Sequence, residues 1–367
     1  MTNGFSGSNG RQSQNSRNGY RSRTAPAALL VIALLALALF AASGCSNNND
    51  NNKDLVGNWY KLSDFDGVPR SDAVVFVIGD KAYVGTGYDG DNRLKDFWEY
   101  DSQLNNWTRK ADFPGAARNG AVAFATSSKG YVGTGYDGNS RLKDFYEYDP
   151  ASNSWRQIAD FGGSARYGAI AFGIGDKGYV GTGDDENYLK DFWEYDPATN
   201  LWTQKVSMSG AKRRDAVAFV IDGKAYVGTG LNNGTYESDL WQYDPAGDKW
   251  TKKNAIADVS SKDFDDDYTN IVGMSKVAFA INGTGFITTG GQGTAGTTAW
   301  AYNPSTDRWT QKTSLEASGR AEAVGFAIGD RGYVATGRNS SYYFDDLWGF
   351  TPGAEQKDLD KVTILEP

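Results

Sequence analysis

The stretch "GYVGTGYDGNSRLKDFYEYDPASNSW", residues 130–155, decides the fold because nearly the same sequence occurs earlier in the chain. "AYVGTGYDGDNRLKDFWEYDSQLNNW" stands at residues 82–107. A phrase that recurs at a fixed interval predicts a repeat architecture. The aromatic residue that opens the glycine-rich phrase recurs at intervals of 48, 48, 47, 60 and 47 residues, at Tyr83, Tyr131, Tyr179, Tyr226, Phe286 and Tyr333.

Each unit contains four β-like runs separated by turn residues. In the second unit these runs lie at residues 121–125, 130–135, 144–149 and 154–158. Gly, Pro, Asp and Asn between the runs favour tight turns. Four antiparallel strands per unit are typical of one propeller blade. The sequence therefore predicts an all-β protein, a six-bladed β-propeller.

The tryptophans support this interpretation, because all eleven fall on two positions of the unit. Strands near a propeller axis are crowded and take small residues, whereas outer strands diverge and need large side chains between blades. We therefore expect the tryptophans to fill the space between the outer strands. Five stand in the third run and six open the fourth: Trp98, Trp193, Trp241, Trp300 and Trp348, then Trp59, Trp107, Trp155, Trp202, Trp250 and Trp309.

The sixth unit lacks its fourth run. No tryptophan follows "DDLWGFTP" at residues 345–352, whereas "VGNWYKL" at residues 56–62 precedes the first unit as an unpaired fourth run. We expect this N-terminal strand to complete the last blade and close the ring. The predicted propeller spans residues 55–352, followed by a C-terminal tail at residues 353–367.

The N-terminal region is a separate object. Four arginines and no acids precede sixteen uninterrupted apolar residues at positions 27–42. This length favours a secretory signal over a membrane span, which needs about 20 apolar residues; an uncleaved signal anchor is the alternative. We assign residues 1–44 to a signal peptide. The polar residues 45–54 have nothing to bury and are expected to form a flexible tether.

Composition excludes several kinds of chemistry. The chain has no histidine and one cysteine, Cys45. Zinc sites of the Cys/His kind, Ser-His-Asp triads and Cys-His dyads are therefore absent, and we expect no metal and no cofactor. Without residues 1–44 the chain has 33 basic and 45 acidic residues, a formal charge of −12. This charge disfavours nucleic acid as a partner.

Two resemblances follow from these motifs. Arginine, a first run, Tyr-Val-Gly-x-Gly, Tyr-Asp-Pro and a later Trp together resemble the kelch repeat, with "GTG" where that family usually has a glycine pair. This resemblance covers residues 55–352 and implies a propeller without fixing a function. "ASGC" at residues 42–45 resembles the lipobox of bacterial lipoproteins, with Ala42 where leucine is usual. It implies a lipid on Cys45, attachment to a membrane and, with Ser46 next, placement in the outer membrane.

The glycine phrase and the "LKD" aspartates are interpreted as scaffold. No helix is expected after "GTG" that would supply the free N–H groups of a phosphate loop. Glycine there suits a close approach between backbones. The repeated aspartates are expected to accept backbone N–H groups of the loops; they are Asp96, Asp144, Asp191, Asp239 and Asp346.

Function is expected on one face of the propeller. Loops that join strands two to three and four to one emerge on the same face, and both sets vary in sequence. A ring of arginines enters the first strands at Arg70, Arg118, Arg166, Arg213 and Arg320, with Gly273 in the fifth unit. Two residues later stand Asp72, Asp215 and Glu322, or Gly120, Gly168 and Ser275.

Arg118 and Arg166 have no adjacent acid, so they are the preferred candidates for binding a carboxylate or sugar hydroxyls. The alternative is that the arginines pair with acids and backbone of neighbouring blades. Tyrosines at the loop tips, foremost Tyr88, Tyr136 and Tyr188, are candidate stacking groups for a sugar or a protein.

The loop after the fourth blade has twelve extra residues and four aspartates, Asp263, Asp265, Asp266 and Asp267. The alternating ligand pattern of a calcium loop is absent. A solvated acidic loop is favoured, and a lid over the site is the alternative.

These observations favour a non-catalytic binding protein that holds a glycan or an envelope protein on its variable face. The alternative is an enzyme that resembles N-acetylneuraminate epimerase, a kelch sugar mutarotase, with Glu322, Asp72 or Asp215 as acid–base group. A purely structural envelope component is the third possibility. Kelch proteins include galactose oxidase, but its copper site requires histidines, so that activity is excluded.

Overall fold

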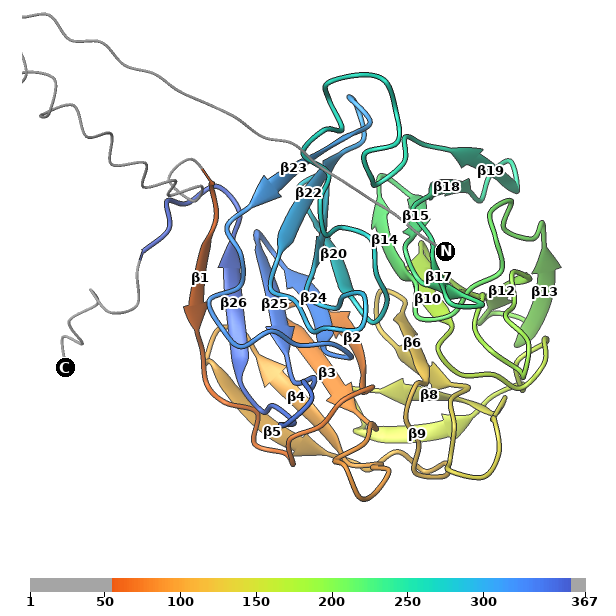
Figure 1. Cartoon of the computed structure of the whole chain (residues 1–367). Helices are drawn as coiled ribbons and strands as arrows, with labels where there is room; N and C mark the ends of the chain where they lie inside the picture. The colour runs from red at the N-terminus through yellow and green to blue at the C-terminus, as the bar shows by residue number, and fades with distance from the viewer. Residues whose placement is uncertain (1–54, 358–367) are drawn as a thin grey trace, which may run out of the picture. The chain divides into compact units, whose positions relative to one another are not determined.

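The computed structural model describes residues 55–357 of the chain. The predicted signal peptide, Cys45 and the tether lie outside these residues, as do residues 358–367 of the predicted tail. Within the described range all regular elements are strands, in six four-stranded antiparallel sheets and one two-stranded hairpin (Figure 1). The prediction of a six-bladed β-propeller is confirmed. No helix of residues 55–357 is long and apolar enough to cross a membrane.

The first three blades are continuous four-strand meanders. Their sheets follow chain order, and the turns between strands one and two are short. The strands of blades one, two and three are β2 (Val74–Ile78), β3 (Lys81–Gly85), β4 (Phe97–Asp101) and β5 (Asn106–Lys110); β6 (Val122–Ala125), β7 (Gly130–Gly133), β8 (Phe145–Asp149) and β9 (Ser154–Gln157); β10 (Ile170–Ile174), β11 (Lys177–Gly181), β12 (Phe192–Asp196) and β13 (Leu201–Lys205).

The last three blades contain the departures from the repeat. Blade four carries an extra hairpin between its second and third strands, and blade six takes its outer strand from the N-terminal end. Their strands are β14 (Val217–Ile221), β15 (Lys224–Gly228), the hairpin β16 (Leu231–Asn232) and β17 (Thr235–Tyr236), β18 (Leu240–Asp244) and β19 (Lys249–Lys252); β20 (Val277–Ile281), β21 (Thr284–Thr288), β22 (Ala299–Asn303) and β23 (Arg308–Lys312); β24 (Val324–Ile328), β25 (Arg331–Ala335), β26 (Leu347–Thr351) and β1 (Asn58–Lys61).

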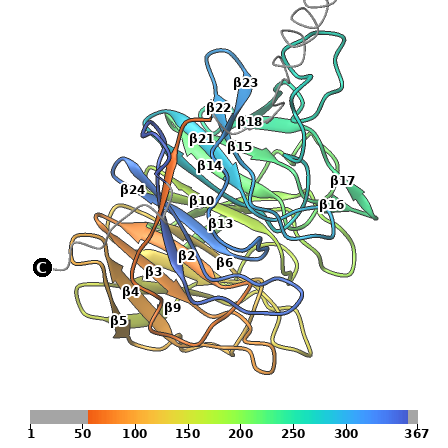
Figure 2. The same ribbon diagram turned by 60° about the vertical axis from the view of Figure 1, so that its left-hand side comes forward.

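The ring is closed by β1, as the sequence predicts. β1 pairs antiparallel with β26, and the two strands lie side by side in Figure 1; in Figure 2 the orange β1 runs along the blue strands of the last blade. Trp59 stands opposite Phe350, and their ring centroids are 4.5 Å apart. The Trp59 side chain is 1% exposed, and its Nε1 donates to the carbonyl oxygen of Thr313 in blade five at 2.8 Å. The N-terminal strand is therefore the outer strand of blade six, and its tryptophan also bonds to blade five.

Side-chain size increases from the axis outwards. The first strands surround a central channel lined mainly by Ala, Val and Ile. Farther out, aromatic residues of adjacent blades pack together: Phe76 stacks on Tyr83, and both contact Tyr148 of the next blade, with centroids 6.3 and 5.5 Å away. Large side chains thus fill the widening space between the outer strands, as the positions of the tryptophans predict.

Six equivalent residues, here called the mouth ring, surround one end of the channel. Each donates its backbone N–H to the carbonyl oxygen of its equivalent in the preceding blade, at 2.8 to 3.2 Å, and the ring closes from Asp72 to Glu322. All six have a φ between 51° and 60°, in the left-handed region. The mouth ring consists of Asp72, Gly120, Gly168, Asp215, Ser275 and Glu322.

The last glycine of each "GTG" phrase, or of "TTG" and "ATG" in blades five and six, makes a second connection between blades. The N–H of Gly87 donates to the carbonyl oxygen of Arg118 in the next blade at 2.8 Å, and the other five blades repeat this bond. Gly87 has a φ of 104°, and a Cβ there would lie 2.7 Å from the carbonyl oxygen of Ser71. The phrase is a close backbone approach, in agreement with its interpretation as scaffold.

Candidate functional site

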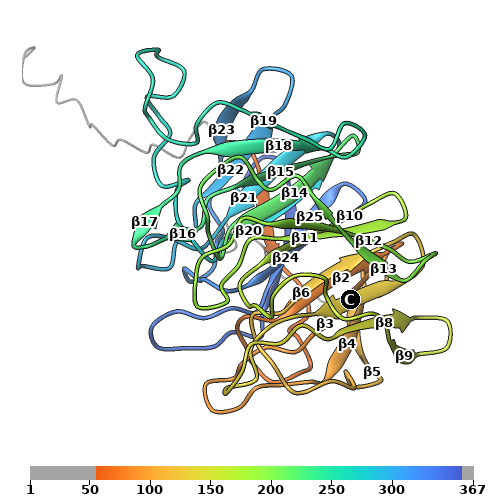
Figure 3. The ribbon, with the colours of Figure 1, turned by 90° about the vertical axis from the view of Figure 1, so that its right-hand side faces the viewer.

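The two sets of variable loops meet on the same face of the propeller, here called the variable face. Isolated bridges join the loop before the first strand to the loop after the second strand, as between Ser71 and Tyr88 and between Asn119 and Tyr136. The β16–β17 hairpin lies on this side and projects from it (Figure 3). The mouth ring opens at the centre of this face.

The five predicted arginines lie inside the blades. Each is 0% exposed, and each forms an ion pair with an "LKD" aspartate of its own blade. Arg118 is representative: Nη1 and Nη2 donate to the two carboxylate oxygens of Asp144 at 2.7 and 2.8 Å, and Nη1 also donates to the carbonyl oxygen of Thr134 at 2.8 Å. The pairs are Arg70–Asp96, Arg118–Asp144, Arg166–Asp191, Arg213–Asp239 and Arg320–Asp346.

This arrangement corrects two expectations. Arg118 and Arg166 are fully buried, so a ligand in solvent cannot reach them. Their guanidinium groups already bind a carboxylate of the same blade. The aspartates accept guanidinium and indole N–H groups, as Asp96 does from Arg70 and from Trp98 Nε1 at 2.7 Å. Burial raises the pKa of Asp96, but the hydrogen bonds and charge of Arg70 outweigh it and lower that pKa below its ordinary value.

Blade five replaces both members of this pair. Gly273 and Thr298 occupy the arginine and aspartate positions, and Lys276 enters from the channel side instead. Its Nζ donates to the carbonyl oxygen of Thr289 at 2.8 Å, the oxygen that an arginine contacts in every other blade. Lys276 is 9% exposed and has no ion-pair partner among residues 55–357, so burial lowers its pKa to about 8.

Three acids of the mouth ring share a cavity of about 130 Å³ with Lys276. Burial and, to a smaller extent, the charges of Glu322 and Asp215 together raise the pKa of Asp72 to about 8. Burial likewise raises the pKa of Asp215 to about 6, although Arg214 opposes this. Glu322 accepts two hydrogen bonds from Arg338, at 2.5 and 2.9 Å. The channel mouth thus contains carboxyl groups that exchange protons near neutral pH.

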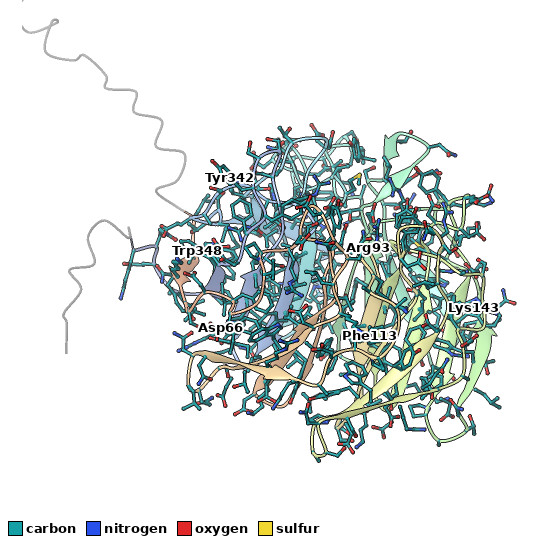
Figure 4. All side chains as sticks on the ribbon, turned by 90° about the horizontal axis from the view of Figure 1, so that it is seen from below. Asp66, Arg93, Phe113, Lys143, Tyr342 and Trp348 are labelled. Carbon is teal, nitrogen blue, oxygen red and sulfur yellow. The ribbon has the colours of Figure 1, made fainter. Side chains whose placement is uncertain are left out.

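The predicted tyrosines lie around the mouth ring among a second, more exposed set of arginines. Tyr136 lies under the guanidinium of Arg93 at 4.8 Å and donates its hydroxyl to the carbonyl oxygen of Gly138. Tyr88 lies 5.4 Å from Arg93, and Tyr188 lies 6.0 Å from Arg214. Arg93 lies near the middle of the view in Figure 4, whereas Lys143 lies at its edge.

A pocket of about 330 Å³, here called the blade-five pocket, opens on the variable face between blades four, five and six. Tyr236, Met274, Ala295, Glu322 and Arg338 are among its lining residues. Two residues that the sequence offers as candidates belong to it: Glu322, and Tyr236 as a further tyrosine at a loop tip. The sequence holds a signal for it, because "GGQGTAG" at residues 290–296 is unlike the bulky loops of the other blades.

The insertion after blade four is neither fully solvated nor a simple acidic loop. Its Ile256, Tyr268 and Ile271 are buried in the core with Trp300 and Trp309 of blade five. The Tyr268 hydroxyl accepts the backbone N–H of Trp309 at 2.6 Å. Asp258, Asp265 and Asp266 bring oxygens within 4.8 Å of one another, but the Asp265 carboxylate already accepts hydrogen bonds from the loop. The expectation of a solvated loop is therefore wrong for its apolar half.

Comparisons with known proteins agree with the repeat. The KLHDC2/KLHL20/DRC7 kelch-repeats domain matches residues 54–180, and the kelch motif matches residues 212–254. A kelch domain-containing protein of Vibrio cholerae serotype O1 is 38% identical over 76 residues, which are 18% of this chain and 21% of that protein. The chain thus matches about a fifth of the length of this relative.

The solved structure of YjhT superposes with a TM-score of 0.64 at 19% identity, over 78% of this chain and 95% of that one. At this identity the likeness concerns the fold alone. The kelch models match residues in blades one to four. Blades five and six repeat the same four strands and the glycine contact, and blade six also repeats the arginine–aspartate pair. The chain is a kelch-repeat β-propeller.

Proposed function

We propose that the protein is a lipid-anchored binding protein of the cell envelope, which holds a glycan or a protein partner on its variable face. The kelch propeller supports a binding role in general, because it presents variable loops on a rigid scaffold. The observation that carries the proposal is the blade-five pocket, whose volume of about 330 Å³ lies in the range of ligand sites. It combines apolar walls with a few polar groups, as such sites do.

The position of β1 determines where the proposed anchor would join the propeller. Asn58 at the start of β1 pairs with Thr351 at the end of β26, and a third strand runs away from the variable face. The described chain therefore begins, at residue 55, on the opposite face. Ten residues from Cys45 to Asp54 reach at most about 35 Å, so a lipid on Cys45 would hold the protein with its pocket directed away from the membrane.

Binding is tested with the mature protein on a glycan array and in pull-downs from envelope extract. We expect Arg338→Ala to weaken capture of the ligand, because it removes a wall of the pocket and leaves Glu322 unpaired. Lys224→Ala is the matched control, since it breaks an exposed ion pair with Asp244 in a turn on the opposite face. Equal loss in both variants, or no ligand for the wild type, contradicts a binding role of the variable face.

The anchor is tested by metabolic labelling with a palmitate analogue. We expect label on the wild type and none on Cys45→Ala, which should also leave the membrane fraction. A wild-type chain that carries no label contradicts the lipid anchor and leaves the binding test unaffected.

A sugar mutarotase is the second candidate, and the raised pKa values at the channel mouth favour it. A carboxyl group with a pKa near the working pH is suited to general acid–base catalysis, and Asp72 and Asp215 meet this condition. NMR exchange spectroscopy of N-acetylneuraminate anomers measures the reaction directly. We expect Asp72→Asn to abolish any acceleration; a wild-type rate equal to that of buffer removes this candidate.

A further inference from the structure

At three junctions of the ring, neighbouring blades touch on the variable face through two equivalent positions. One is the residue that closes the loop between strands two and three, and the other is the residue after the glycine phrase of the next blade. Arg93 lies over Tyr136 at 4.8 Å in this way. Arg141 Nη2 lies 2.8 Å from Asp184 Oδ1 between blades two and three. Such contacts fill the outer part of the face with large side chains.

Blade five has small residues at both positions, Gly291 and Ala295. The large residues that face them belong to the adjoining blades: Tyr236 from blade four and Arg338 from blade six. Both side chains line the blade-five pocket. The pocket is therefore the space that such contacts fill where blade one meets two, blade two meets three and blade six meets one.

The residues on either side of this space keep unused contact surface. No aromatic or cation–π contact within residues 55–357 involves Tyr236. Arg338 donates through Nε and Nη2 to Glu322, and no hydrogen bond of the described residues uses its Nη1. The Arg338 side chain is 43% exposed, so part of its guanidinium group is open to a ligand.

The electrostatics of the pocket favour a neutral ligand. The two-point contact with Glu322 balances the charge of Arg338, so the pocket offers a flat guanidinium face without a net positive charge. Such a face stacks on aromatic rings. Met274 adds a thioether, which makes favourable contacts with aromatic rings. Thr294, Asn339 and Ser340 supply hydrogen-bonding groups at the wall.

We propose that the blade-five pocket binds a neutral aromatic ring, which packs between Tyr236 and Arg338 and replaces the two missing interblade contacts. A phenol or indole fits this chemistry, because the ring stacks while its single O–H or N–H finds an acceptor in the wall. The inference rests on the proposed binding role of the variable face and names the chemical group recognised there.

The test uses fluorine NMR of 4-fluorophenol and 5-fluoroindole with the mature protein. We expect both signals to broaden with the wild type. Ala295→Tyr places in blade five the residue that blades four and six carry at the same position, so it should fill the pocket and remove the broadening. Gln292→Tyr is the matched control, because it adds the same side chain to the same loop at an exposed position outside the pocket lining; it should bind as the wild type does.

A second variant keeps the test decisive if Ala295→Tyr lowers the melting temperature strongly. Tyr236→Ala removes one wall without adding bulk and should weaken binding several-fold. Competition by a tyrosine-containing peptide at lower concentration than by phenol assigns the ring to a polypeptide partner, and the reverse order assigns it to a small molecule.

The proposal is overturned if Ala295→Tyr and Tyr236→Ala broaden the signals as the wild type does, or if the wild type broadens neither. It is also overturned if methyl glucoside displaces the probes, because a pyranose would then be the occupant. In these cases a positive glycan array or pull-down still leaves the proposed function standing.

Discussion

At the scale of single residues, the five buried arginine–aspartate pairs do most to organise the variable face. Each arginine stands before the first strand, and its guanidinium binds the aspartate that precedes the third strand. It also donates to the carbonyl oxygen of the threonine after the second strand. Arg70, Arg118 and Arg166 each lie over a phenylalanine at 4.8 Å. One side chain thus connects the two loops that build the face.

Loss of one such arginine should be costly. We expect Arg118→Ala to lower the free energy of unfolding by about 3 to 5 kcal/mol, because it leaves the Asp144 carboxylate without its partner in a largely buried site. Chemical denaturation measures this change. Arg109→Ala, which breaks the exposed pair with Asp112, should change the stability little; similar effects of the two substitutions would contradict the assigned role.

The pH dependence of stability should show a minimum near pH 8. The raised pKa of Asp72 means that its protonated form is favoured by folding, so its contribution is complete below about pH 4 and is lost as the pH rises through 8. The pKa of Lys276 is lowered from 10.5 to about 8, so stability should recover as the pH rises further towards 10.5. Thermal melts between pH 4 and 10 measure both limbs.

Two substitutions assign the limbs. Asp72→Asn should flatten the fall between pH 4 and 8, and Lys276→Met should flatten the rise above pH 8. A melting temperature that does not depend on pH in either range would show that these groups titrate normally in the folded protein.

The fate of the arginines could not be read from the sequence. Arg118 and Asp144 are 26 residues apart, and each repeats in almost every blade. Their repetition suits a structural role as well as a functional one. Only the three-dimensional packing shows that the two side chains face each other. The two departures in blade five, Gly273 and Thr298, occur together because they are the two members of the same pair.

At the scale of elements, β1 is the strand on which closure depends. Its four residues pair along β26, and Trp59 is the most buried of the fourth-strand tryptophans. The sequence predicts this strand well, because the count of tryptophans leaves one fourth run missing at the end and one in excess at the beginning.

Truncation of this tryptophan should weaken the closure. We expect Trp59→Ala to cost about 3 to 5 kcal/mol, because a large buried side chain is replaced by a cavity and the hydrogen bond to Thr313 is lost. A thermal-melt comparison checks this. Trp155→Ala is the control at the equivalent position of blade two, where the indole is only half-buried and the loss should be smaller.

The loops between strands two and three are the elements that the sequence describes least well. Their tyrosines are visible as candidates, but their contacts with Arg93 and Arg214 cross from one blade to another. The blade-five pocket exists because Gly291 and Ala295 have small side chains. The sequence alone does not show which residues of the adjoining blades face them. A position-by-position comparison of the six loops would have indicated it.

At the scale of the whole molecule, the repeat predicts nearly everything. Blade number, strand order and closure follow from the spacing of the units, because each blade contacts mainly its two neighbours and repeats the same contacts. The mouth ring adds a continuous circle of backbone hydrogen bonds that no single blade contains. The blades therefore depend on one another in folding.

This dependence predicts a single cooperative unfolding transition. With the ring closed, we expect circular dichroism and tryptophan fluorescence to report the same denaturant midpoint. Deletion of residues 55–61, which include β1, should separate the two transitions, since blade six then loses its outer strand and its bond to blade five. Coincident curves for the deleted chain would contradict the dependence of the blades on closure.

The two ends of the described chain meet at one blade. The N–H of Gly57 donates to the carbonyl oxygen of Ala354 at 2.9 Å, and that of Lys357 donates to Asn58 Oδ1 at 2.8 Å. A short peptide linker from residue 357 to residue 55 would make a covalent circle of the same fold. That circle can be reopened at another short turn, such as the one between β14 and β15, to give a circular permutant. In such a permutant the N-terminus, where the proposed lipid anchor joins, would lie at another blade, whereas the blade-five pocket would be unchanged.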